Sequence, residues 1–244
     1  REKVKAAFVY PTIVLIASVG VVFFMLVFIV PVFAKVYDQF HAKLPAVTLS
    51  LIVLSNIILH YWWMVGALGV GAVMGVKKYL RTPAGRRLYD KMKLKAPLLG
   101  KLNRKIAIAR FAETFAGASK AGVPIIRALA ISAATSGNVI IIDAVMKGAG
   151  LVQEGASLAG PLEQTGEFPP MVTRMVAAGE HSGNLDEMLS ELTRFYSRDI
   201  EYTVDRLTKI MEPAMTVCVG GIVLFVLLAL YMPIFNMTQV LHAK

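Results

Sequence analysis

The sequence predicts an all-α membrane protein with three transmembrane helices and one cytoplasmic antiparallel helical bundle. Its composition is the first observation, because 56% of the 244 residues are hydrophobic and the mean hydropathy is +0.62, more than an ordinary soluble domain has. Charge spacing is the second: no Asp, Glu, Lys or Arg lies in residues 6–34, 44–76 or 213–243. Each gap can hold the roughly 20 apolar residues of a spanning helix. A helical periodicity in the remaining residues is the third.

The first two elements occupy residues 1–48 and 49–80. We expect residues 1–48 to hold the first transmembrane helix and a short outer loop. In residues 49–80, Tyr61, Trp62 and Trp63 cluster, and such side chains prefer the headgroup interface. We therefore expect an interfacial helix start near residues 46–60, followed by a second span from about Trp62 to Leu80. The side chains of Lys77 and Lys78, near the end of this span, would extend to the headgroups at that membrane surface.

Residues 81–211 are predicted to form the helical bundle, and residues 212–244 the third transmembrane helix with an outer tail. Gly and Pro punctuate the bundle region, and apolar residues recur three and four apart between them, which is typical of amphipathic helices. Asn184 with Glu187 resembles a capping box that opens the last bundle helix. The apolar stripe of that helix comprises Met188, Leu189, Leu192, Phe195, Tyr196, Ile200, Val204, Leu207 and Ile210.

Basic residues concentrate just after the second predicted span. Residues 77–105 hold eleven Lys or Arg and one acid, Asp90, which accounts for the whole net charge of +10. Cationic flanks stay in the cytoplasm, so we expect the bundle inside and the C-terminus outside. A nucleic-acid site is disfavoured because the stretch adjoins a span and lacks an interleaved aromatic motif. The candidate membrane-surface residues are Lys77, Lys78, Arg81, Arg86 and Arg87.

The first and last apolar runs are similar to each other. Two prolines and a phenylalanine recur at one offset of 202 residues: Pro11, Pro31 and Phe33 match Pro213, Pro233 and Phe235. This shared register indicates an internal repeat. Because the second copy follows a bundle, we expect the first copy to have its own bundle upstream of Arg1, so that the chain is a fragment.

A proline marks the entry to the third span. Pro213 has no N–H to donate to the Lys209 carbonyl and biases Glu212 away from helical geometry. We therefore expect a kink at this joint, with Glu212 held at the headgroup level. The equivalent residue in the first copy is Tyr10, so the kink does not need the acid, and Glu212 is a candidate for binding a partner.

Five segments together resemble the type II secretion F family: "KVKAAFVYP", "LPAVT", "KAGVPIIRAL", "FPPMVTRMVAAGEHSGNLDEML" and "EPAMTV…YMPIF". The resemblance covers nearly every residue and implies two bundles and three spans in the full form. It also implies a non-enzymatic platform in the bacterial inner membrane, at the base of a type IV pilus or type II secretion machine. Its implied partners are a cytoplasmic hexameric ATPase, pilins or pseudopilins, and other inner-membrane assembly proteins. The "YMPIF" ending favours the pilus branch.

The residues themselves offer no catalytic site. There is no G-x-x-x-x-G-K-[ST] phosphate loop, no H-E-x-x-H and no serine–histidine elbow, so we expect no enzyme activity, cofactor or metal. Faces rich in Gly and Ala, such as "GALGVGAVMG", favour a homo-oligomer. A membrane transporter or channel subunit is the alternative, but it would place charges inside the spans, and a membrane enzyme is less favoured still. The candidate partner-binding or mechanical residues are Glu180, Gly183, Asp186, Glu212, Pro213 and Pro11; for Glu180, a local cap, a partner contact and a cation site all stay open.

Overall fold

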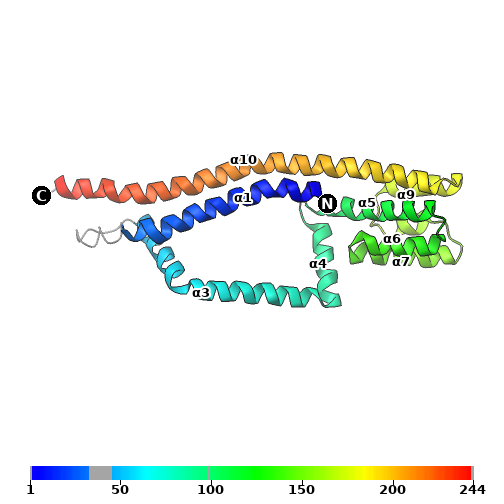
Figure 1. The fold of residues 1–244 in the computed structure, drawn as a ribbon, viewed down its shortest axis with the longest axis horizontal. Coiled ribbons are helices and arrows are strands. Elements are labelled where there is room, and N and C mark those ends of the chain that lie inside the picture. The colour runs from blue at the N-terminus through cyan, green and yellow to red at the C-terminus, as the bar shows by residue number, and fades with distance from the viewer. Residues whose placement is uncertain (1, 33–45, 98, 243–244) are drawn as a thin grey trace. The chain divides into compact units, whose positions relative to one another are not determined.

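The computed structural model describes residues 2–32, 46–97 and 99–242, and every regular element in these ranges is helical (Figure 1). This confirms the all-α prediction. Most of the predicted outer loop and the last two residues lie outside the described ranges. The elements are α1 (Glu2–Phe24), the π-helix η1 (Met25–Ile29), α3 (Ala46–Leu80), α4 (Pro83–Lys95), α5 (Leu99–Lys120), α6 (Ile125–Ser136), α7 (Val139–Gln153), α8 (Ala159–Gln164), α9 (Pro170–Ser182) and α10 (Leu185–His242).

The chain forms two units, which we describe separately. One unit comprises residues 1–75 and 205–244, and the other comprises residues 76–204. The second unit contains α4 to α9 and the start of α10. Two helices belong to both units: α10, which begins at Leu185 and ends at His242, and α3, whose last residues, 76–80, lie in the second unit.

In the first unit, large apolar side chains face outward along the helices. Two helical stretches among the described residues are long and apolar enough to cross a membrane, Val9–Val32 and Leu185–Phe225. The described apolar side chains of α3 from Trp63 to Val76 are exposed as well. Outward apolar surface of this extent is typical of contact with lipid rather than water. The second predicted span, in α3, is not among these two stretches, so that span and the total of three stay predictions.

The prediction that Pro213 moves Glu212 out of helical geometry is wrong. Glu212 and Pro213 both lie within α10, and Pro11 likewise lies inside α1. A proline removes one hydrogen bond from a helix, but the turns on either side still have theirs, so the helix can continue. The expected kink angle at this joint stays a prediction.

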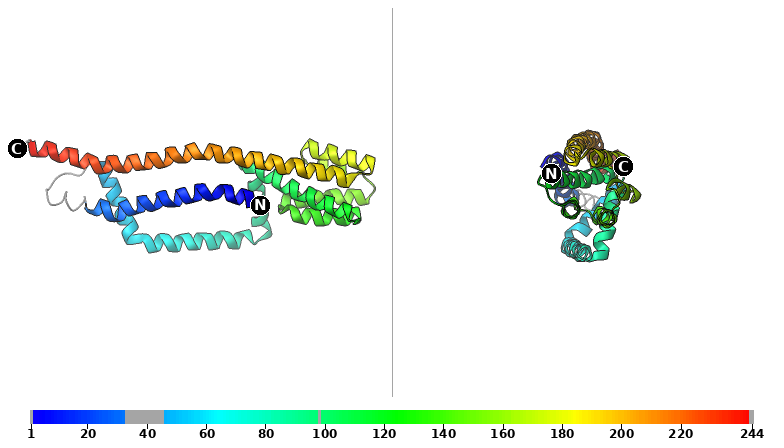
Figure 2. Two further views of the ribbon diagram at one scale, coloured as in Figure 1. Left: turned by 45° about the horizontal axis from the view of Figure 1, so that its top comes forward. Right: turned by 90° about the vertical axis from the view of Figure 1, so that its right-hand side faces the viewer.

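In the second unit, an apolar core holds the helices together. α5, α6 and α7 lie side by side (Figures 1 and 2), and α8 packs against α7 and α9. The Phe111 ring lies 5.5 Å from the ring of Phe168 and 5.6 Å from that of Phe115, centroid to centroid. The fully buried side chains at the centre include Ile108, Phe111, Phe115, Leu129, Ile141, Val145, Val172, Val176, Leu189 and Leu192.

The predicted stripe on the last bundle helix is confirmed in part. Leu189, Leu192 and Tyr196 are buried in the core, whereas Phe195 is 45% and Ile210 53% exposed. Phe195 instead lies edge-on to its neighbour, with ring centroids 5.6 Å apart. Burial raises the pKa of the Tyr196 hydroxyl above its ordinary value, and the nearby Asp199 carboxylate raises it further. Tyr196 therefore belongs to the interior of the bundle.

Candidate functional site

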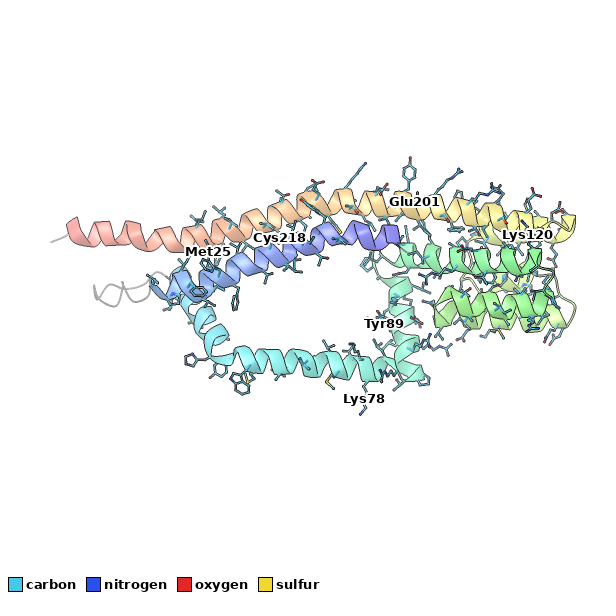
Figure 3. All side chains as sticks on the ribbon, viewed as in Figure 1. Met25, Lys78, Tyr89, Lys120, Glu201 and Cys218 are labelled. Atoms are coloured by element: carbon cyan, nitrogen blue, oxygen red, sulfur yellow. The ribbon has the colours of Figure 1, made fainter. Side chains whose placement is uncertain are left out.

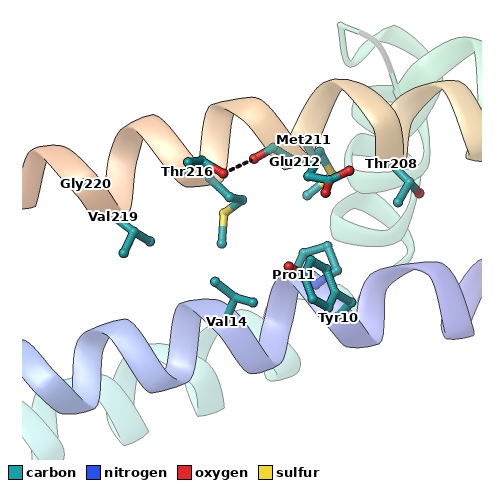
Figure 4. A pocket seen from close by; sticks show the side chains of 10 residues that line it. Tyr10, Pro11, Val14, Thr208, Met211, Glu212, Thr216, Val219 and Gly220 are labelled. Atoms are coloured by element: carbon teal, nitrogen blue, oxygen red, sulfur yellow. Dashed lines mark hydrogen bonds between the residues drawn. The ribbon is translucent and has the colours of Figure 1, made fainter.

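The structure brings the two repeated proline entries together. Tyr10 and Pro11 of α1 lie across a groove of about 600 Å³ from Met211 and Glu212 of α10 (Figure 4). Pro11 is buried, and both sides of the groove belong to the same unit. The remaining lining residues are Val14, Thr208, Met215, Thr216, Val219 and Gly220. Pro213, by contrast, is not among the lining residues.

Glu212 supplies the carboxylate of this groove. Its side chain is exposed, and no ion pair joins it to another side chain in the part of the chain that the structure describes. Its backbone carbonyl accepts a hydrogen bond of 3.0 Å from the Thr216 hydroxyl (Figure 4). Ser18 makes the same kind of bond, 2.7 Å, to the Val14 carbonyl of α1. Such bonds satisfy hydroxyls in apolar surroundings.

A second, apolar groove of about 490 Å³ continues beside the first. Met215 and Val219 line both grooves. The second one adds Cys218, an exposed free thiol, and Phe23 of α1. Together the two grooves give α1 and α10 an apolar cleft with one acidic group near its end, which suits an apolar helix or acyl chain that carries a polar or cationic group.

Glu180 has a partner inside the bundle. Both of its carboxylate oxygens accept from the Leu158 N–H, at 2.8 and 2.9 Å. Leu158 immediately precedes α8, so a residue of α9 ties down the beginning of that short helix. This bond supports the local capping role among the three alternatives for Glu180, while binding of a cation or a further partner stays a prediction.

The segment around Gly183 shapes the junction between α9 and α10. Gly183 has φ 73°, a left-handed conformation that favours glycine and ends α9. Gly179 allows close approach, because a Cβ there would lie 2.9 Å from the Cα of Leu185. Asp186 is half-buried in the first turn of α10, where an acid is favourable for the helix dipole. The Asn184 carbonyl accepts from the Met188 N–H at 3.1 Å, so α10 begins where the sequence predicts.

The predicted membrane-surface cations do not all have the same surroundings. Lys77, Lys78, Arg81 and Arg86 are exposed. The Arg87 guanidinium, however, lies 3.3 Å from the Asp143 carboxylate of α7. Arg87 is therefore partly engaged by the bundle itself.

Asp90 is a buried structural position that the sequence did not identify. It is 4% exposed, and its carboxylate accepts from the Val139 N–H at 2.9 Å. Its backbone carbonyl accepts from the Asn138 side chain at 3.1 Å. The only acid among eleven bases thus anchors the N-terminus of α7, and its isolation in the basic stretch was the available signal.

Two further ion pairs fix α5 to other parts of the bundle. The Arg104 guanidinium lies 3.0 Å from the Glu167 carboxylate. The Lys105 ammonium lies 2.8 Å from that of Asp199 and donates to the Thr203 hydroxyl at 3.1 Å. Within the described ranges, no group of three or more His, Cys, Asp or Glu side chains could hold a metal ion.

Comparisons with known proteins match the chain to one family and to several relatives. The family described as Type II secretion system (T2SS), protein F matches residues 111–233. The chain is 37% identical over 237 residues to a type IV pilus assembly protein PilC of Myxococcus xanthus, covering 97% of this chain and 57% of the relative. It is 38% identical over 239 residues to the type II secretion system protein F of Pseudomonas aeruginosa, covering 98% and 59%. A PilC of Thermus thermophilus is 38% identical over 245 residues, covering 100% and 60%. The chain therefore spans under two thirds of the length of these relatives.

Proposed function

We propose that this chain, which belongs to the type II secretion system protein F family, is part of an inner-membrane platform in a type IV pilus or type II secretion assembly machine. The observation that carries the proposal is the match to the family together with similarity to relatives named for pilus assembly and type II secretion, along nearly the whole chain. The helices support it, because apolar outward faces suit a membrane and the bundle core suits a scaffold.

The proposed topology has three spans, a cytoplasmic bundle and an external C-terminus. It rests on the basic stretch at residues 77–105 and the cytoplasmic preference of such flanks. In a Cys218→Ser background, Ser157→Cys is expected to resist an impermeant thiol reagent in intact cells, whereas Ala243→Cys is expected to react. Ser157 is exposed on the bundle, so its protection would come from the membrane. Labelling of Ser157→Cys with protection of Ala243→Cys would reverse the topology.

The mechanical part of the proposal concerns α10. This helix contributes Leu189 and Leu192 to the bundle core and Glu212 to the groove beside α1. A continuous helix can pass displacement along its length because each turn is hydrogen-bonded to the next. We propose that an ATPase acts on the bundle and that α10 carries the change to the grooves, where a pilin or pseudopilin is handled.

Energy for assembly would come from the ATPase partner. We expect the purified full-length protein to hydrolyse no ATP, to self-associate in mild detergents, and to bind other inner-membrane assembly proteins. Crosslinking in native membranes followed by purification is expected to recover a hexameric assembly ATPase and a pilin or pseudopilin. The control is efficient crosslinking of the protein to lipid probes in the same membranes. If that control succeeds and neither the ATPase nor a pilin or pseudopilin is recovered, the platform role is contradicted.

A transporter or channel subunit is the alternative function. It would need polar groups along a path through the membrane unit. The first groove offers one such group, Glu212, with Thr208 and Thr216 beside it. Proteoliposomes containing the protein are expected to show no ion flux above empty liposomes, and a flux abolished by Glu212→Gln would favour the alternative.

A further inference from the structure

The outer face of α4 combines apolar and cationic side chains. On its inner side, Asp90 and Leu94 are buried against the bundle, and α4 packs on α5 and α7. On its outer side, Leu88 is 50% exposed, Tyr89 43% and Met92 62%. Residues three and four apart share a helix face, so these three side chains form one patch that the bundle does not cover.

Four cations border this patch. Lys91 and Lys95 follow Leu88 at helical spacings of three and seven, and both are exposed. Arg86 and Lys93 flank Tyr89, which is labelled in Figure 3, in the same way. The Lys93 ammonium lies 4.2 Å from the centre of the Tyr89 ring. The one acid of α4 faces inward, with its carboxylate engaged at the start of α7. The outer face of α4 therefore carries positive charge without a compensating acid of its own helix.

The turn before α4 joins it firmly to the end of α3. Thr82 donates from its hydroxyl to the Tyr79 carbonyl at 2.7 Å and accepts from the Gly85 N–H at 3.1 Å. Any side chain at Gly85 would collide with the Tyr79 carbonyl. Only Arg81 and Thr82 separate the two helices. If α3 spans the membrane as proposed, α4 begins at the headgroup level.

We propose that the outer face of α4 binds an anionic lipid surface. Leu88, Tyr89 and Met92 enter the boundary between headgroups and acyl chains, while Arg86, Lys91, Lys93 and Lys95 contact lipid phosphates. Helices with mixed apolar and basic faces bind anionic membranes in this way. The inference rests on the proposed topology and extends it, because it identifies the part of the bundle that contacts the membrane and the class of lipid it contacts.

Charge complementarity and size favour lipid over a protein partner. A stable protein interface buries about 800 Å² on each partner and has an uncharged centre. Here only three apolar side chains are available, and cations border them on both sides. A bilayer with anionic headgroups provides an apolar interior for the three apolar side chains and negative charge for the cations beside them.

The test uses the full chain in nanodiscs made with phosphatidylcholine alone or mixed with phosphatidylglycerol. In a Cys218→Ser background, one cysteine is placed at Met92, Leu68 or Met146 and labelled with a fluorophore that spin-labelled lipid quenches. Leu68 lies on α3 and Met146 on α7, and both are exposed, at 66% and 48%. Leu68→Cys reports the proposed span, and Met146→Cys reports an exposed position of the bundle outside α4.

We expect lipid quenching of the Met92→Cys label to rise strongly when phosphatidylglycerol is present. The Leu68→Cys label should be quenched in both nanodiscs and the Met146→Cys label in neither. Adding Arg86→Gln, Lys91→Gln and Lys95→Gln together should abolish the phosphatidylglycerol dependence at Met92. Raising the salt to 1 M should weaken it, because the Debye length falls from about 10 Å to about 3 Å.

The other outcomes separate this inference from the proposed topology. A Met92→Cys label that behaves like the Met146→Cys label, with Leu68→Cys quenched, would overturn lipid binding by α4 and leave the topology intact. Equal quenching at Met92 in both nanodiscs would overturn the preference for anionic lipid. A Met92→Cys label shielded from water but not quenched by lipid would assign the surface to a protein. An unquenched Leu68→Cys label would contradict the topology itself.

Discussion

Gly179→Ala tests whether the α9–α10 junction depends on close helix approach. The added Cβ would lie 2.9 Å from the Leu185 Cα and 3.2 Å from the Met188 Cβ, whereas unstrained carbon atoms lie about 3.5 to 4.0 Å apart. The backbone at Leu185 must therefore move by roughly 0.6 Å or more. Overpacking of this kind lowers the free energy of unfolding by about 1–3 kcal/mol. The higher helix propensity of alanine offsets up to about 1 kcal/mol of this loss.

Gly117→Ala is the matched control, because Gly117 also lies inside a helix but has no heavy atom within 4 Å of its added Cβ. Gly117→Ala has the same gain in helix propensity, but its added Cβ meets no neighbouring atom. The difference between the two substitutions isolates the overpacking of about 1–3 kcal/mol. Thermal unfolding of the purified protein in one detergent should place the Tm of Gly179→Ala roughly 2–12 °C below that of Gly117→Ala. An equal or higher Tm for Gly179→Ala would refute the close packing at this junction.

Asp90→Ala should lower the free energy of unfolding by about 1–2 kcal/mol, because the first N–H of α7 loses its acceptor. Thermal unfolding of this variant, compared with that of Asp90→Asn, measures the loss. An unchanged stability in Asp90→Ala would contradict the capping of α7 by Asp90. A double-mutant cycle on Lys105 and Asp199, whose side chains are 27% and 33% exposed, should give a coupling near or below about 1 kcal/mol. A value several-fold larger would contradict solvent screening of the pair. If α10 needs the expected kink at Pro213 to act on the grooves, Pro213→Ala, which restores a helical N–H, should straighten the joint and impair filament assembly at matched membrane expression, more than Pro11→Ala does. Wild-type assembly by Pro213→Ala would remove any mechanical role for this joint.

The helical fold was predictable because its signals are local. Charge gaps and apolar spacing of three and four indicated the helices, and Gly183 with Asn184 marked the start of α10, as the structure confirms. The stripe was less accurate at Phe195, since periodicity alone cannot decide which of two adjacent aromatic residues turns inward. The prediction included both aromatic residues, and the structure buries only Tyr196.

The candidate sites depended on contacts between distant residues. Asp90 binds the N–H of Val139, 49 residues away, and Glu180 binds that of Leu158, 22 residues away. No local sequence pattern predicts which distant backbone N–H will donate a hydrogen bond to a given carboxylate. The effect of Pro213 was overestimated for a different reason, because one lost hydrogen bond is outweighed when the rest of a long helix is intact.

Deletion and complementation of the gene test the platform function most directly. Surface filaments and exported proteins would be measured in the parent strain, in the deletion strain, and in the deletion strain carrying the full-length gene. The account predicts that the deletion abolishes filament assembly or type II export, that the gene restores it, and that pilin or exported substrate accumulates inside the deletion strain. A deletion strain that assembles filaments and exports proteins like its parent would contradict the account.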